Sequence, residues 1–123
     1  MRSVLRAALA GLVLSAALSG AAMAGTMDTL FGNTVILTYD GAPPAKVFVD
    51  ADGGFSVMAG DGSSSSGTWE VKGSKVCYTQ TSPAPPADAK PVCLPNVSHA
   101  VGETWEGTGV GGMHFTAVIQ QGR

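Results

Sequence analysis

The residues of this sequence best suited to catalysis or metal binding are two histidines and a run of serines. His99 and His114 are not spaced as a metal-binding pair, and we expect neither to have a nearby acid that would complete one. As catalytic bases they would need a serine on a strained turn, whereas Ser63–Ser66 has the composition of a flexible linker. We therefore predict no catalytic residue and place both histidines at the surface or a rim.

A second candidate is the segment Asp50-x-Asp52-Gly53, which is similar to the first half of a calcium-binding loop. Such a loop requires a bidentate glutamate at its twelfth position, where this chain has Asp61. A hairpin turn, with an aspartate accepting backbone N–H bonds, accounts for the same residues. The sequence thus predicts no metal site, no cofactor and no enzymatic activity.

Six aromatic residues are the most promising candidates for binding. They share the predicted inner face of a β-structure, where tryptophan and tyrosine could stack on an apolar or planar ligand and orient it through their N–H and O–H groups. The alternative is that the rings simply fill the core. The six are Tyr39, Phe55, Trp69, Tyr78, Trp105 and Phe115.

Residues 1–24 have the parts of a secretory signal peptide in order: two arginines, an apolar run over residues 7–18, and small residues at 22 and 24. The run is shorter than the roughly 20 residues that a membrane-spanning helix needs. We expect cleavage after Ala24. The product would be one periplasmic or secreted domain, residues 25–123, with no membrane span after signal removal.

The charge of that domain argues against a nucleic-acid partner. Of the seven Lys and Arg residues in the chain, two lie in the signal peptide, so five face nine Asp and Glu residues. The domain is therefore acidic, with a charge of about −4, whereas proteins that bind nucleic acid carry basic patches.

Two cysteines are present, Cys77 and Cys93. In an oxidising compartment they are expected to form a disulfide, because their spacing is far from that of a redox-active C-x-x-C pair. The bridge would close the proline-rich loop 82–91 and stabilise the domain by about 3 kcal/mol.

Turn signals recur every eight to twelve residues between alternating stretches, which predicts an all-β fold. We expect eight short antiparallel strands in a meander that closes into a small barrel, since closure removes exposed edges. A two-sheet sandwich is the alternative. The predicted strands cover residues 34–39, 46–50, 55–58, 68–72, 75–79, 92–94, 103–106 and 113–120.

Alternation along these strands predicts which side chains face inward. Both cysteines fall on outer faces. The second strand is ambiguous, because Val47 and Val49 compete with Phe48 for the interior. The Gly/Ser tract 60–67 is expected to be too polar and flexible to pack.

Several motifs span most of the domain: F-G-N-T-V at 31–35, D-x-D-G-G-F at 50–55, G-T-W-E-V-K-G-S-K-V-C-Y at 67–78, and V-G-E-T-W at 101–105. In these the chain resembles small exported proteins of unknown function from alphaproteobacteria, which are regarded as lipocalin-like or avidin-like barrels. The lipocalin signature G-x-W is replaced by Phe31-Gly32-Asn33. The resemblance implies a fold and a compartment but no functional residues.

Together these features favour an exported, non-catalytic binding module for a small apolar or aromatic ligand held inside the barrel. One alternative is a protein-binding module, such as an inhibitor of an envelope-acting enzyme, that uses loops 82–91 and 95–102. A further alternative is a structural protein of the envelope. The partner would accordingly be an unidentified small molecule or an envelope protein.

Overall fold

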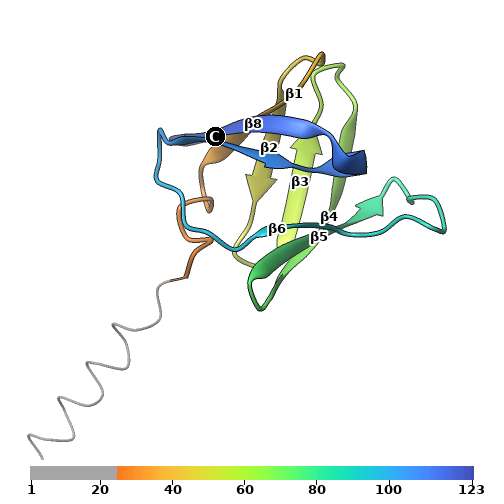
Figure 1. The fold of residues 1–123 in the computed structure, drawn as a ribbon, viewed down its shortest axis with the longest axis horizontal. Coiled ribbons are helices and arrows are strands. Elements are labelled where there is room, and N and C mark those ends of the chain that lie inside the picture. Colours follow the sequence, from red (N-terminus) through yellow and green to blue (C-terminus); the bar gives the residue numbers. More distant parts are fainter. Residues whose placement is uncertain (1–24) are drawn as a thin grey trace, which may run out of the picture.

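The computed structural model describes residues 25–123, so the predicted signal peptide lies outside the described residues. The fold is all-β, and its eight antiparallel strands form one sheet (Figure 1). The strands are β1 (Thr34–Tyr39), β2 (Ala45–Val49), β3 (Gly54–Met58), β4 (Ser64–Lys72), β5 (Lys75–Ser82), β6 (Val92–Pro95), β7 (Thr104–Thr108) and β8 (His114–Gln120). A short 3₁₀ turn, η1 (Val110–Gly112), joins β7 to β8.

The sheet curls into a nearly closed barrel. Its strand order is β6-β5-β4-β3-β2-β1-β8-β7, so the first strand pairs with the last along the full length of β1. Each strand pairs with its sequence neighbours, except that β6 and β7 are not hydrogen-bonded to each other. The predicted eight-stranded meander barrel is therefore confirmed, with one gap in its wall.

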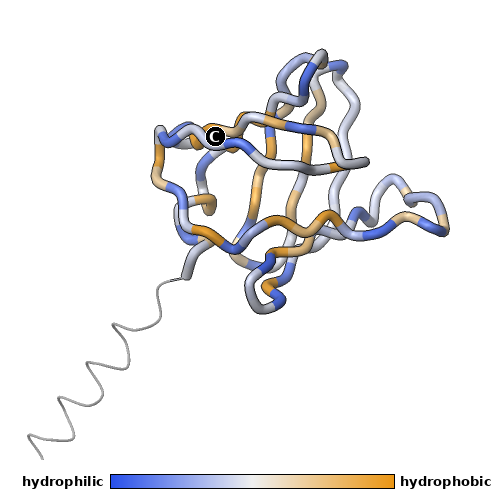
Figure 2. Tube along the Cα trace, viewed as in Figure 1, coloured by the Kyte–Doolittle hydropathy of each residue, from blue (hydrophilic) through white to orange (hydrophobic). Residues whose placement is uncertain are grey.

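Cross-strand pairing aligns the apolar residues of the inner face. Val47 of β2 lies opposite Val35 on one side and Val57 on the other. Val49 is almost completely buried, which settles the ambiguity of this strand in favour of the two valines. Phe48 faces outward, where the Arg123 guanidinium lies over its ring at 5.3 Å. Figure 2 shows apolar stretches running along the strands and hydrophilic stretches in the loops at the top of the view.

The prediction for the Gly/Ser tract was wrong in its second half. Ser64–Gly67 belongs to β4 and pairs with β3, Gly67 opposite Phe55 and Ser65 opposite Val57. The backbone groups of β3 need a partner whatever the side chains beside them, so tertiary pairing overrides the weak strand preference of serine and glycine.

Residues 25–33 close one end of the barrel. Met27 is buried there with Val49 and Val76. The C-terminus joins this end, because the Gly122 N–H donates to Asn33 Oδ1 at 2.9 Å. The opposite end is formed by the β1–β2, β3–β4, β5–β6 and β7–β8 connections.

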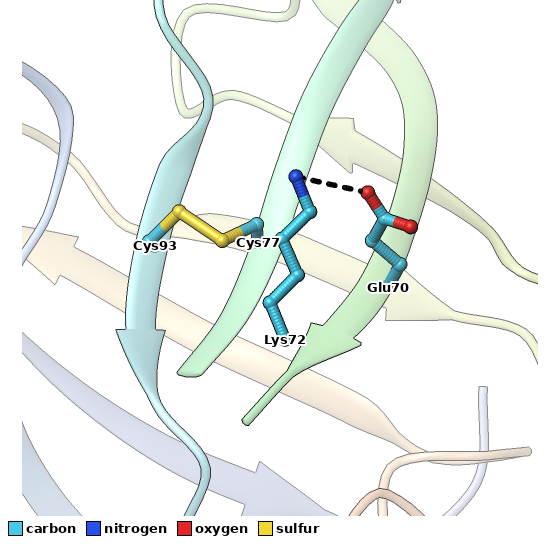
Figure 3. Close-up of a disulfide and its surroundings, with 4 residues drawn as sticks. All are labelled: Glu70, Lys72, Cys77 and Cys93. Carbon is cyan, nitrogen blue, oxygen red and sulfur yellow. Dashed lines mark ion pairs between the residues drawn. A yellow bond between two sulfur atoms is a disulfide. The ribbon is translucent and has the colours of Figure 1, made fainter. Parts of the chain in front are cut away.

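The predicted disulfide is confirmed. Cys77 of β5 and Cys93 of β6 lie directly opposite each other on the outer face (Figure 3). Beside them on β4, the Lys72 ammonium pairs with the Glu70 carboxylate at 3.2 Å, and both side chains are exposed. The bridge ties β6, an edge strand, to the rest of the sheet.

Candidate functional site

The barrel interior opens into a cavity of about 660 Å³ that extends to the surrounding loops. Its walls are the inward side chains of the strands, mostly valine, leucine and aromatic residues. Residues of the β1–β2, β3–β4 and β5–β6 loops, among them Pro43, Gly60 and Pro86, also line it, so the cavity opens at the end away from residues 25–33. We call this space the barrel cavity.

Five of the six aromatic residues singled out in the sequence line the barrel cavity; they are Tyr39, Phe55, Tyr78, Trp105 and Phe115. They pack in part as edge-to-face pairs. The ring centroids are 5.9 Å apart for Tyr39 and Phe115, and 5.4 Å apart for Phe55 and Tyr78. Such pairs hold the rings in fixed orientations, so that the wall presents a preformed surface.

The sixth aromatic residue, Trp69, lies outside the barrel cavity. It packs at the closed end, where its ring centroid is 5.9 Å from that of Phe31. Its indole Nε1–H donates to the Asp50 carbonyl oxygen at 2.9 Å. Trp69 therefore packs at the closed end of the barrel, and its prediction as a ligand-binding residue together with the other five aromatic residues is corrected.

Two tyrosine hydroxyls supply polar groups to the apolar wall. The Tyr39 hydroxyl oxygen accepts a hydrogen bond from the Val110 N–H at 3.3 Å. The Tyr78 side chain also lines the barrel cavity. Burial raises the pKa of Tyr78 to about 12, so its phenol is neutral at physiological pH and can donate a hydrogen bond to a guest.

The irregular connection between β6 and β7 places His99 against the wall of the barrel. The imidazole stacks on the Trp105 indole with centroids 3.7 Å apart and planes inclined by 5°. His99 Nδ1 lies 2.7 Å from Glu103 Oε2. This hydrogen bond is the main cause that lowers the pKa of Glu103, and the hydrogen bond from the Ala100 N–H is the second. Residue spacing gave no signal for the stacking, because the segment has no regular periodicity.

His114 is bracketed by two carboxylates on the outside of the barrel. Its Nδ1 lies 3.2 Å from Asp40 Oδ1 and its Nε2 lies 2.8 Å from Glu106 Oε1. Both hydrogen bonds raise the pKa of His114, and the one with the Asp40 carboxylate has the larger effect. Both histidines thus have an acid nearby in space, which their spacing in the sequence did not indicate. Even so, no cluster of ligands able to hold a metal occurs within the described part of the chain.

The bracketing of His114 predicts a pH-dependent contribution to stability. Because the folded-state pKa is raised above the unfolded value of about 6.5, the contribution is complete below that value and is lost as pH rises through the folded pKa. His114→Gln should therefore melt at a lower temperature than the parent protein at pH 5, with the difference shrinking at pH 9.

The control is Met113→Gln, an exposed neighbour without a carboxylate partner among the described residues. It should show the same small difference from the parent at both pH values. A His114→Gln difference that does not change with pH would contradict the role assigned to the two carboxylates.

No protein-family model matches the chain, and comparisons with curated proteins and with solved structures gave no match either. Within residues 25–123, no helix has the length and apolar character needed to cross a membrane.

Proposed function

We propose that this protein is an exported, non-catalytic binding module that takes a small apolar or aromatic molecule into its barrel. The observation that carries the proposal is the barrel cavity. Its volume of about 660 Å³ falls within the range of roughly 300–1,000 Å³ typical of ligand pockets. Apolar walls with a few hydroxyl groups are also typical of such pockets, and an eight-stranded barrel can hold one small ligand.

The distribution of burial supports an interior that is not filled by its own side chains. Ile119 and Val49 are almost completely buried. Along β1, by contrast, burial decreases from Val35 to Leu37 and Tyr39, which are only partly buried although they face the interior. The part of β1 towards the open end thus leaves apolar surface uncovered, although Phe115 opposite Tyr39 is buried. A ligand placed there would gain the free energy of covering this surface.

Two features support export to the periplasm or the exterior. Disulfides persist mainly in oxidising compartments, and Cys77 and Cys93 are bonded. In addition, the Gly25 N–H donates to Asp28 Oδ2 at 3.1 Å. Cleavage after Ala24 would turn this amide into an ammonium group beside the same carboxylate, which would strengthen the contact.

The proposal predicts that filling the barrel cavity abolishes binding. Val57 faces the cavity, whereas its neighbour Ser56 points to the outer face of the same strand. Val57→Phe should weaken binding of the neutral aromatic probe N-phenyl-1-naphthylamine by at least about tenfold, equivalent to about 1.4 kcal/mol. Probe fluorescence during titration measures the affinity.

Ser56→Phe is the matched control, since it adds the same ring outside the cavity and should leave affinity unchanged. If both variants lower the affinity for the probe equally, the probe binds elsewhere on the protein. If the unmodified protein binds neither this probe nor other compounds in a broad apolar panel, the proposal fails.

A second candidate function is supported by the loop 83–91. It is exposed throughout, projects from the barrel (Figure 1), and is tied at its base by the disulfide. A projecting loop anchored in this way is suited to insertion into a partner protein, such as an envelope-acting enzyme, together with loop 95–102. Failure of the small-molecule proposal would leave this one in its place.

A further inference from the structure

The gap between β6 and β7 contains a second cavity of about 680 Å³, which we call the side cavity. Its position follows from the topology, since these are the two adjacent strands of the described barrel that share no ladder. The side cavity and the barrel cavity have five wall residues in common; these are Leu30, Tyr78, Leu94, Trp105 and Phe115. The two cavities are therefore adjacent, with these side chains between them.

The two cavities differ in chemistry. The barrel cavity is bounded mainly by apolar side chains. The barrel cavity has charged groups only in its loops, at Asp61 and Lys90, whereas polar groups make up a larger share of the side cavity, among them Thr108, Lys75, His99 and Glu106. A ligand that contacts both would be apolar at one end and polar at the other.

The partners of these polar groups indicate which kind of polar end fits. His99 is bonded to Glu103, and Glu106 shares His114 with Asp40. Lys75 has no ion-pair partner among residues 25–123. The Lys75 ammonium and the neutral Tyr78 phenol on the shared wall are hydrogen-bond donors, which favour oxygen acceptors in a ligand.

We infer that the ligand is a single-chain amphiphile with an oxygen-bearing end, its alkyl chain in the barrel cavity and its oxygen end in the gap between β6 and β7. This inference rests on the proposed function and specifies the ligand class for the same site. The gap in the barrel wall binds the polar end of the ligand, and Tyr78 lies beside the junction between the alkyl chain and the polar end.

The test compares decanoate, 1-decanol and decyltrimethylammonium by isothermal titration calorimetry. The two ions are used below their micelle concentrations and decanol below its solubility limit. Decanoate and decanol share the oxygen acceptor, and any advantage of decanoate over decanol would report the charge of Lys75. Decyltrimethylammonium has the same chain but no acceptor, and should bind at least about tenfold more weakly than decanoate. Equal binding of decanoate and the ammonium compound would overturn the inference.

Blocking the side cavity tests its role. Val97 lines only the side cavity, and it is exposed, so Val97→Trp should not disturb folding. This variant should bind decanoate about tenfold more weakly, and its affinity for N-phenyl-1-naphthylamine should be unchanged. Val101→Trp, an exposed change in the same connection outside both cavities, should affect neither.

The outcomes separate the two proposals. If N-phenyl-1-naphthylamine binds but Val97→Trp leaves decanoate unaffected, the side cavity does not hold the polar end, while the proposed function stands. If neither the probe nor any decyl compound binds, the proposed function itself fails. Tyr78→Phe removes only a hydroxyl and should bind decanoate more weakly than the parent protein. An unchanged affinity would exclude that hydroxyl from the site.

Discussion

Replacing Trp69 with alanine is expected to lower the free energy of unfolding by about 3 kcal/mol, the lower end of the range for large-to-small core changes. The loss has two sources: the contact with Phe31 at the closed end, and the hydrogen bond from Nε1 to the Asp50 carbonyl oxygen. Affinity for N-phenyl-1-naphthylamine should be unchanged in the folded variant, because Trp69 does not line the barrel cavity. Chemical denaturation and probe titration measure the two quantities.

Trp105→Ala provides the contrast, since Trp105 lines both cavities. This variant should lose probe affinity by at least about tenfold. Trp69→Phe is the conservative control: it keeps an aromatic ring beside Phe31 and should recover most of the stability lost in Trp69→Ala. If Trp69→Ala abolished probe binding while Trp105→Ala preserved it, the assignment of the two tryptophans to different ends of the barrel would be wrong.

The different positions of the two tryptophans show the limit of alternation as a guide. Residue parity within a strand predicts the face on which a side chain lies, and it correctly put both tryptophans on the inner face. It carries no information about height along the barrel axis. Trp69 lies beside the β2–β3 turn, where its backbone N–H donates to the Gly53 carbonyl oxygen. Its height follows from the register of β4 against its neighbours, which is a property of the whole sheet.

Features set by local sequence were predicted well. The Asp52 turn is an example, with the Asp52 carboxylate accepting the Gly54 N–H at 3.0 Å as expected of a hairpin turn. Features that depend on residues distant in the sequence were not predicted. His114 meets Asp40 across 74 positions of sequence, because β1 and β8 pair. The gap between β6 and β7 has no local signal either, because both segments read as ordinary short strands, and the side cavity in that gap was not anticipated.

Removing the disulfide should have an effect of similar size, centred on β6. Replacing Cys77 and Cys93 together with serine is expected to lower the free energy of unfolding by about 3 kcal/mol, from the entropy that the unfolded chain regains when this 16-residue loop is opened. β6 should suffer most. It spans four residues, Val92–Pro95, and within residues 25–123 it pairs with β5 alone, so without the bridge little holds it to the barrel.

Hydrogen exchange distinguishes this local effect from a general loss of stability. In the double serine variant, the β6 amides should lose protection by a larger factor than those of β1, which pairs on both sides. Because Val92 and Leu94 line the barrel cavity, probe affinity should fall with the protection of β6. Reduction of the unmodified protein by dithiothreitol is the control and should reproduce both changes. Uniform loss of protection in β1 and β6 would show that the bridge stabilises the barrel as a whole, without a particular role in holding the strand that borders the gap.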